Sequence, residues 1–308
     1  DKTIEVSEQL ILATDSSHSH WHLIEAEDRR YRDISAGELI LKAMLAREAK
    51  PEPDEDTRPG VDIDVLGPQP TVLDSVDLSL ELSGDEYKEQ LAKYQSRLQD
   101  LAWDAYRQNR SVVAVFEGWD AAGKGSAIRR VTRAIDPRLY RLIQFAAPTD
   151  EENAHHYLWR FWRQLQRDGR CTFFDRSWYG RVLVERVEQF ATEREWQRAY
   201  SEINQFEQQL VEHGSIVLKF WIHIDNEEQM RRFKAREKEP HKRHKITEDD
   251  WRNRERWHDY EIAVDQMVSH TSTRYAPWTL VSGNDKPYAR IQILKTFCKN
   301  MKKALSSD

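Results

Sequence analysis

The sequence predicts an α/β protein with a parallel β-sheet of about five strands, covered by helices in a three-layer sandwich. Two observations support this fold class. Extended, mostly apolar runs that suit strands alternate with segments of helical periodicity, and a glycine-rich loop follows the first run. The runs comprise residues 112–116, 140–145, 171–174, 216–224 and 278–281. Strands that alternate with helices pair in parallel through right-handed crossovers.

The predicted helices have identifiable starts and ends. Residues 83–86 form a Ser-x-x-Glu capping box, and the helix that follows has the apolar stripe Tyr87, Leu91, Tyr94, Leu98 and Leu101. A Thr-x-x-Glu box at residues 192–195 opens a helix that Gly214 ends. Between these two helices, apolar residues at positions 157–165 predict a helix that Gly169 stops.

The loop after the first strand reads Gly-Trp-Asp-Ala-Ala-Gly-Lys-Gly-Ser over residues 118–126. A strand, a glycine-rich turn and a helix start in this order are typical of a phosphate-binding P-loop. Backbone N–H groups and the positive helix end bind phosphate oxygens there, and Lys124 adds a cation. The alternative is a glycine turn with a solvated lysine. The predicted phosphate-binding loop residues are Gly118, Gly123, Gly125 and Ser126.

Two positions depart from the usual P-loop pattern. The residue after the lysine is normally Ser or Thr, which binds Mg²⁺, but here it is Gly125, with Ser126 one residue later. Asp120 lies inside the loop, where a carboxylate repels phosphate unless it holds a metal or a proton. We expect Asp120 to bind Mg²⁺ (or Mn²⁺). The alternative is an Asp that only shapes the turn.

A second set of candidates follows the buried strand at 171–174. Asp175 comes directly after it, at the edge where parallel sheets bind ligands, and suits a carboxylate that reaches Mg²⁺. Arg176 and Arg181 offer planar donors for phosphate oxygens. Glu185, one turn further on, is a weaker candidate that could instead pair with an arginine. The alternative for the whole set is a helix-capping Asp with surface arginines.

Residues 231–256 hold 11 Lys/Arg and 6 Asp/Glu. Many of these could form i,i+4 pairs on exposed helices. Pro240 interrupts the segment, which favours a basic lid that closes over phosphates and excludes water. So many cations exceed what one nucleotide needs and indicate a longer polyanion. The candidates in this lid are Arg236, Lys242, Arg243 and Arg254.

The amino-acid composition indicates the class of protein and the cellular compartment. The chain has 308 residues, 39% of them hydrophobic and 32% charged, which supports a real core with a well-solvated surface. Only Cys171 and Cys298 occur, both in predicted core elements, which fits a reducing compartment. No signal peptide or long apolar run is present, so we expect a soluble cytoplasmic protein without a membrane partner.

The charge is unevenly distributed, and the N-terminal part has its own organisation. Residues 1–82 carry 19 Asp/Glu and 8 Lys/Arg, a balance of −11, which leaves +5 for residues 83–308 out of a total of −6. Five of the ten prolines fall within residues 46–82, which predicts an acidic, proline-rich linker.

Residues before the linker partly repeat the C-terminus. Thr14 and Trp21 have the spacing of Thr271 and Trp278, and matches continue at the same offset in the pairs Leu23/Leu280, Asp28/Asp285, Tyr31/Tyr288 and Ile34/Ile291. A repeat at a fixed offset indicates a duplicated unit. We therefore expect residues 1–45 to be the C-terminal remnant of an upstream repeat, residues 46–82 the linker, and residues 83–308 a complete P-loop domain.

Three stretches closely resemble the polyphosphate kinase 2 family: residues 118–125, residues 174–186, and residues 219–224 with Arg232-Phe-x-x-Arg236. The resemblance covers residues 84–305, and Gly125 is the residue this family has after the lysine. It implies a P-loop nucleotide-kinase fold and Mg²⁺-dependent phosphoryl transfer between inorganic polyphosphate and nucleotides. By resemblance, Asp120 and Asp175 are the metal and catalytic carboxylates, and the phosphate-handling cations are Lys124, Arg176 and Arg236.

Within that family, the partial repeat resembles the fused tandem polyphosphate:AMP phosphotransferases, and residues 148–161 look like the same branch. The resemblance implies AMP as acceptor and ADP as product. Reversibility and the use of ADP as an acceptor stay open. We also expect a homo-oligomer.

Two other functions stay open. Residues 116–120 and 175–176 also resemble thymidylate-kinase-type enzymes, so an ATP-dependent nucleoside monophosphate kinase is the first alternative. Gly125 and the excess cations argue against it. The second is a non-catalytic nucleotide- or polyanion-binding module, which would need neither carboxylate. Nucleic acid is not an expected partner, because no aromatic–basic platform is present.

Overall fold

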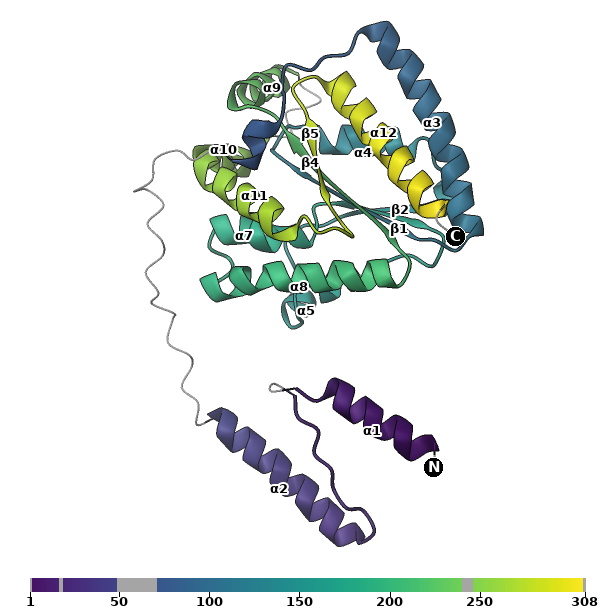
Figure 1. Cartoon of the computed structure of the whole chain (residues 1–308). Coiled ribbons are helices and arrows are strands. Elements are labelled where there is room, and N and C mark those ends of the chain that lie inside the picture. The colour runs from purple at the N-terminus through teal and green to yellow at the C-terminus, as the bar shows by residue number, and fades with distance from the viewer. Residues whose placement is uncertain (1, 17–18, 49–70, 240–245, 307–308) are drawn as a thin grey trace. The chain divides into compact units, whose positions relative to one another are not determined.

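The computed structural model describes residues 2–16, 19–48, 71–239 and 246–306. Its contacts divide the chain into two units, residues 1–65 and 66–308 (Figure 1). The described residues of the first unit form the helices α1 (Lys2–Thr14) and α2 (Arg29–Glu48). The second unit contains the sheet and all the predicted site residues that the structure describes.

The second unit is built on a five-stranded sheet in which every neighbouring pair is parallel, as predicted. The strand order is β2-β3-β1-β4-β5. Because all strands run the same way, the loops after β1 and β3 emerge side by side at one edge. The strands are β1 (Val112–Gly118), β2 (Tyr140–Gln144), β3 (Cys171–Asp175), β4 (Ile216–His223) and β5 (Trp278–Ser282).

Helices cover both faces of the sheet (Figure 1). One face carries α3 (Gly84–Arg107), α4 (Lys124–Thr132) and α12 (Lys286–Leu305). The other carries α8 (Glu193–Glu212) and α11 (Trp257–Thr271). The other helices are α5 (Asp150–Asn153), α6 (Trp159–Trp162), α7 (Val184–Val187), α9 (Asn226–Lys238) and α10 (Glu248–Glu255), with 3-10 turns η2 (Val72–Ser75), η3 (Pro137–Leu139) and η4 (Trp178–Val182). The three-layer α/β prediction is confirmed.

The core lies between these layers and is rich in aromatic rings. The central strand β1 is buried along nearly its whole length. The Phe116 ring of β1 stacks on Phe220 of β4 with centroids 5.1 Å apart, and Phe220 in turn stacks on Phe297 of α12 at 5.6 Å. This packing fixes the strand that leads into the glycine-rich loop. No described helix is both long and apolar enough to span a membrane.

The helix predicted around residues 157–165 is much shorter than expected. Helical geometry ends at Trp162, because the backbone N–H of Gln166 donates to the Thr172 hydroxyl of β3 instead of continuing the helix. Gly169 therefore does not stop a helix. It has φ +75°, and a Cβ there would lie 2.9 Å from the carbonyl oxygen of Tyr106. The residue is glycine because α3 approaches it closely.

The segment that joins the two units is described only at its ends. Helix α2 continues to Glu48, and the middle of the predicted linker lies outside the described residues. Its second part packs on the second unit: Leu73 is buried, and the backbone N–H of Val72 donates to the Asp265 carboxylate of α11 (2.7 Å).

Candidate active site

The glycine-rich loop at residues 118–126 connects β1 to α4 and contains two glycines with positive φ. Gly118 has φ +149° and Gly123 has φ +113°, both of which favour glycine. A Cβ on Gly118 would lie 2.5 Å from the carbonyl oxygen of Ile222, so β4 packs directly against the start of the loop. The loop ends at the positive end of α4.

Lys124 folds back over this loop. Its Nζ donates to the carbonyl oxygen of Gly118 at 2.5 Å. The ammonium group is therefore held above the backbone that would surround a phosphate, where a phosphate oxygen can replace the carbonyl as its acceptor. The role of Lys124 as a phosphate-binding cation stays a prediction.

Asp175 lies at the end of β3, opposite Phe116 of the neighbouring strand β1. Its Oδ2 accepts a hydrogen bond from Gln144 Nε2 (3.1 Å). A Cβ on Gly125 would lie 4.0 Å from the same oxygen. The carboxylate therefore faces the start of α4, and the absence of a side chain at residue 125 leaves room between them.

Arg176 has a strained backbone and an unengaged side chain. Its φ is +68°, which for a non-glycine residue costs on the order of 1–3 kcal/mol. Its side chain is exposed, and among the described residues it has no hydrogen-bond or ion-pair partner. A guanidinium held in this way beside Asp175 is suited to an anionic ligand.

Asp120 accepts hydrogen bonds from side chains of α9 and α10, the two helices of the predicted lid. Its Oδ2 accepts from Asn253 Nδ2 of α10 (2.9 Å), and its backbone oxygen accepts from Gln229 Nε2 of α9 (3.2 Å). The Tyr260 hydroxyl of α11 donates to Asn253 Oδ1 (3.2 Å). Asp120 and Asp175 thus follow neighbouring parallel strands, at the same edge of the sheet.

Glu117 is a buried carboxylate beside the loop. Its Oε1 accepts from both the backbone N–H and the hydroxyl of Ser177, each at 2.8 Å. Burial raises the pKa of Glu117, and the nearby Lys124 opposes that rise. These bonds fix the end of β1 to the segment that follows Asp175, so the two halves of the site are tied together.

Arg232 of α9 ties the glycine-rich loop to a second loop. Its buried guanidinium donates through Nη1 to the carbonyl oxygens of Ala121 (3.0 Å) and Ala122 (2.8 Å). Through Nη2 it donates to those of Gly283 (2.6 Å) and Asn284 (2.9 Å). Four carbonyl contacts leave little capacity for phosphate, so Arg232 supports the shape of the loop.

The other lid candidates differ in how far the structure describes them. Arg236 is half-buried, one turn beyond Arg232 on α9. Arg254 donates to the backbone oxygen of Asn226 (2.8 Å) and to Gln229 Oε1 (3.0 Å), so it links α10 to α9. Two further predicted cations, Lys242 and Arg243, lie outside the described residues.

Arg181 and Glu185 form an ion pair with Nε and Oε2 3.1 Å apart. The Arg181 guanidinium also lies over the Tyr157 ring, 4.6 Å from its centroid. Burial raises the pKa of Glu185, whereas Arg181 lowers it. The pairing left open for Glu185 is thus present, and a direct role of either side chain with a nucleotide stays a prediction.

Trp119 connects the loop to the base of the lid. Its ring stacks on Trp257, the first residue of α11, with centroids 3.8 Å apart and an interplanar angle of 8°. Its Nε1 donates to Nδ1 of His223 (2.9 Å). Burial lowers the pKa of His223 to about 4, so the imidazole is a neutral acceptor near neutral pH.

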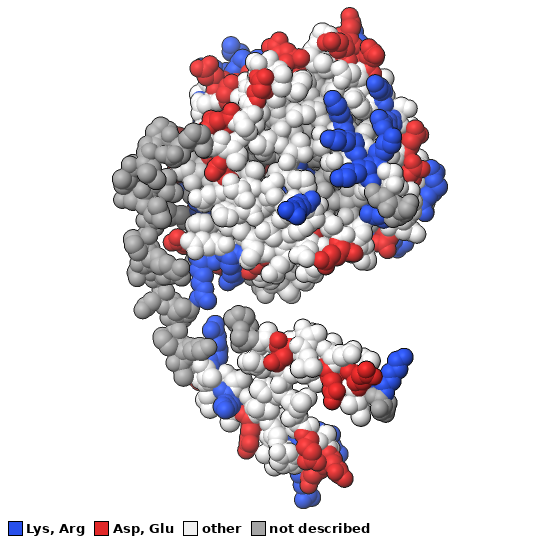
Figure 2. All heavy atoms as spheres, in the orientation of Figure 1, with Lys and Arg blue, Asp and Glu red and all other residues white. Residues whose placement is uncertain are grey.

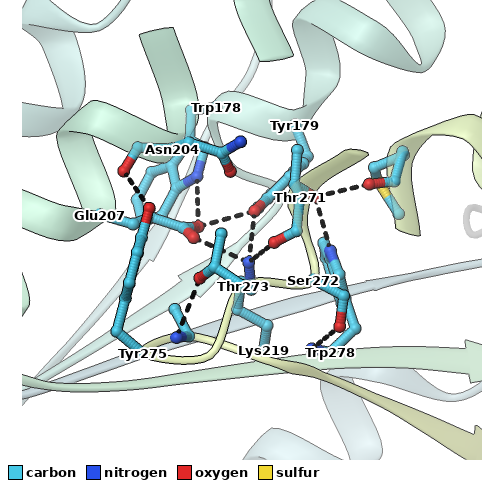
Figure 3. A network of polar contacts seen from close by, with 12 residues as sticks. Trp178, Tyr179, Asn204, Glu207, Lys219, Thr271, Ser272, Thr273, Tyr275 and Trp278 are labelled. Atoms are coloured by element: carbon cyan, nitrogen blue, oxygen red, sulfur yellow. Dashed lines mark hydrogen bonds and ion pairs between the residues drawn. The ribbon is translucent and has the colours of Figure 1, made fainter. Parts of the chain in front are cut away.

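A buried ion pair lies below the segment that follows Arg176 (Figure 3). Lys219 Nζ of β4 lies 2.7 Å from Glu207 Oε2 of α8, and neither side chain is exposed. Glu207 Oε1 accepts from the Tyr179 hydroxyl (2.7 Å) and from Trp178 Nε1 (3.1 Å), while Lys219 also donates to the Tyr179 hydroxyl (2.8 Å). The network fixes η4 and, through it, the backbone that presents Asp175.

The site can supply two carboxylates to a metal. Among the described ranges, no group of three or more His, Cys, Asp or Glu side chains could hold a metal ion. Mg²⁺ commonly takes one or two carboxylates and completes its shell with water and substrate phosphate oxygens. Asp120 and Asp175 therefore fit Mg²⁺ (or Mn²⁺) that arrives together with phosphates.

Three contributors to the site were not predicted from the sequence. Glu117 had a signal, because it is the one carboxylate in the otherwise apolar run before Gly118. Asn253 had none, since it lies 133 residues from Asp120. The arginine motif drew attention to Arg232 but did not reveal that its guanidinium binds loop carbonyls.

The family model described as "Polyphosphate kinase 2 (PPK2)" matches residues 81–308. The chain is 50% identical over 308 residues to a polyphosphate:AMP phosphotransferase of Pseudomonas syringae pv. tomato, and 49% identical over 312 residues to that of Pseudomonas aeruginosa. Both matches cover 100% of this chain but 62% of the relative, so the chain spans less than two thirds of their length. An ADP-polyphosphate phosphotransferase of Rhizobium meliloti is 37% identical over 69% of this chain and 75% of its own.

Solved structures agree with these matches. A crystal structure of a polyphosphate kinase 2 protein from Pseudomonas aeruginosa aligns with a TM-score of 0.88 and 49% identity, covering 99% of this chain and 63% of that one. The polyphosphate kinase 2 structure from Arthrobacter aurescens aligns with a TM-score of 0.72 and 34% identity, covering 75% of this chain and 85% of that one.

Proposed function

The chain belongs to the polyphosphate kinase 2 family, and from that premise we propose that it transfers the terminal phosphoryl group of inorganic polyphosphate to AMP. The products are ADP and a polyphosphate shorter by one phosphate. The names of the two Pseudomonas relatives support this acceptor. The observation that carries the proposal is that a P-loop without the usual hydroxyl after its lysine faces Asp175. Asp175 is followed by Arg176, whose side chain has no partner among the residues that the structure describes.

In this reaction an oxygen of the AMP phosphate forms a bond to the terminal phosphorus of polyphosphate, and the bridging P–O bond breaks. The AMP phosphate is already ionised near neutral pH, so no strong base is needed. Lys124 and Arg176 neutralise charge on the transferred group, and the loop N–H groups orient it. Asp120 and Asp175 would hold Mg²⁺, which screens phosphate charge when bound.

Replacing the charged groups at the loop tests these roles. Lys124→Ala and Asp175→Asn should each reduce turnover about 10²–10³-fold or more, because each removes electrostatic stabilisation of the transferred phosphoryl group. Lys88→Ala is a matched control, since Lys88 is an exposed lysine paired with Asp85 on the first turn of α3. ADP formation by Lys124→Ala at the wild-type rate would contradict the assignment.

The donor is tested separately. Purified protein with AMP and Mg²⁺ should form ADP when polyphosphate is supplied, and much less when ATP is supplied. Efficient turnover with ATP alone would favour the nucleoside monophosphate kinase. Failure with both donors, together with tight polyphosphate binding, would favour a binding module.

We also infer that residues 1–45 are a partial copy of the last elements of the P-loop unit. The bounds of α2 correspond residue for residue to those of α12 at the offset of the sequence repeat. Trp21 Nε1 donates to the Thr14 hydroxyl (2.7 Å), as Trp278 Nε1 donates to that of Thr271 (2.9 Å).

The two copies differ in burial. Ile40 and Met44 of α2 are 61% and 65% exposed, whereas their counterparts Phe297 and Met301 of α12 are fully buried in the core. Because these apolar side chains of α2 are largely exposed, the first copy should be less stable in this chain. Hydrogen exchange on the whole chain should therefore be faster in α1 and α2 than in α11 and α12. Equal protection of both pairs would contradict a remnant and indicate an independent domain.

A further inference from the structure

The positive charge of residues 83–308 is concentrated on helix α12. Residues 83–308 carry a net charge of +5. Helix α12 has six Lys/Arg and no Asp/Glu, so it contributes +6 and the remainder is close to neutral. The excess charge therefore belongs to one helix, which begins beside the glycine-rich loop: Arg290 Nη2 lies 3.4 Å from the Ser126 hydroxyl.

The second half of α12 forms a basic groove with α3, lined by Arg97, Lys295, Lys299 and Lys302 together with Tyr94 and Cys298. The groove has a volume of about 410 Å³. Figure 2 shows Lys and Arg side chains gathered on this side of the second unit, over α12 and α3. An adjoining hollow shares Arg97 and Lys302 but is also lined by Asp100 and Asp104, so the Lys295–Lys299 side is the purely basic one.

Four cations of the groove form no ion pair with any residue that the structure describes. They are Arg97, Lys295, Lys299 and Lys302. The arginines of the lid differ, since Arg232 pairs with Glu228 at 2.5 Å and Arg252 pairs with Glu188 at 2.8 Å. Unpaired like charges three and four residues apart destabilise a helix, so the groove bears a repulsion that a bound polyanion would relieve.

The position of these cations is only partly explained by helix stability. Cations in the last turn of a helix interact favourably with its dipole, which accounts for Lys302 and Lys303. That effect falls off within one turn. It does not explain Lys295, which lies well before the last turn, or Arg97, which lies on another helix and faces the same groove.

We propose that the basic groove is a second binding site for inorganic polyphosphate, separate from the P-loop. The proposal rests on the proposed function, which makes polyphosphate the donor. Along α12, Lys299 lies about 13 Å beyond Arg290, at 1.5 Å per residue. A polyanion with regularly repeated charge can occupy both sites at once, whereas AMP or a short phosphate chain cannot. Occupation of the groove would keep the chain end concentrated at the P-loop.

Binding without turnover tests the groove directly. The triple variant Lys295→Gln, Lys299→Gln, Lys302→Gln should bind long-chain polyphosphate about tenfold or more weakly than the wild type in the absence of AMP, because one of two linked sites is lost. Binding of tripolyphosphate, which is too short to span both sites, should be unchanged. The matched control is Arg167→Gln, Arg194→Gln, Arg274→Gln, which removes the same charge from exposed positions elsewhere on the unit.

If the control triple variant loses as much affinity for long-chain polyphosphate as the groove triple variant, the effect is one of general charge and the proposal is overturned. Wild-type affinity in the groove triple variant would also overturn it. Kinetics separate this result from the proposed function. If the groove exists and polyphosphate is the donor, the groove triple raises KM for long polyphosphate about tenfold but leaves KM for tripolyphosphate unchanged. The groove triple variant could lose affinity for long-chain polyphosphate while the wild type makes no ADP from polyphosphate. That result would support the groove as a polyphosphate site but refute polyphosphate as the phosphoryl donor.

Discussion

The hydrogen bond from Trp119 to His223 should make the stability of the second unit depend on pH. His223 is buried and accepts the Trp119 indole N–H through Nδ1. A protonated imidazole cannot accept that bond, and its charge would be buried. In His223→Asn the side-chain carbonyl can still accept from the indole, but the residue no longer titrates.

The magnitude follows from the pKa of His223, which burial lowers to about 4 from an ordinary value of about 6.5. As the pH falls, His223 is protonated in the unfolded chain before it is protonated in the folded one. The contribution of neutral His223 to the free energy of unfolding is therefore complete above pH 6.5 and is lost as the pH falls toward 4. The full contribution of His223 to the free energy of unfolding is about 3 kcal/mol, of which about 1.4 kcal/mol is already lost at pH 5.5.

This contribution can be measured by urea unfolding of the wild type and of His223→Asn, each at pH 7.5 and pH 5.5. For each protein, the change in the free energy of unfolding between the two pH values is determined, and the two changes are then compared. Other groups titrate in both proteins and cancel. The wild type should lose about 1.4 kcal/mol more than the variant between the two pH values. An equal loss in both proteins would refute the assignment of a depressed histidine pKa to this site.

Three further perturbations test the supports of the site. Gly118→Ala should destabilise the protein by a few kcal/mol, because its Cβ would lie 2.5 Å from the Ile222 carbonyl oxygen, whereas Gly84→Ala, with no atom within 4 Å, should be neutral or stabilising in thermal unfolding. Glu207→Gln should lower the free energy of unfolding by about 3–5 kcal/mol, because Lys219 is left charged and buried without its partner. Adding Lys219→Met should recover much of that stability. If the double variant is no more stable than Glu207→Gln, the broken ion pair is not the cause of the loss. Asn253→Ala removes the donor to Asp120 Oδ2 and should raise the Mg²⁺ concentration needed for half-maximal activity without lowering the unfolding temperature much; an unchanged Mg²⁺ requirement would remove Asn253 from the site.

The sheet was predictable because most of its strands are apolar. Buried parallel strands appear as apolar runs, which located β1, β3 and β4. The edge strand β2 has a single buried residue and was located only as an extended run at residues 140–145. The one helix predicted too long shows the limit of this reasoning. Apolar side chains between residues 157 and 165 do face the core, but the backbone there bonds to Thr172 of β3, a competing partner that periodicity cannot reveal.

The site was predictable to the extent that its chemistry is local in sequence. The loop at residues 118–126 and the end of β3 are contiguous motifs, and the parallel sheet alone places them together. The supporting contacts are not local. Asn253 and Arg232 reach the loop from helices more than 100 residues away, with amide and guanidinium groups that are equally common on solvated surfaces. Because α9 and α10 donate hydrogen bonds to Asp120 and to the loop carbonyls, a movement of these helices would change the contacts of the carboxylate predicted to bind metal. A lid that only excluded water would not need such bonds, so the contacts favour a lid whose closure and metal binding are coupled.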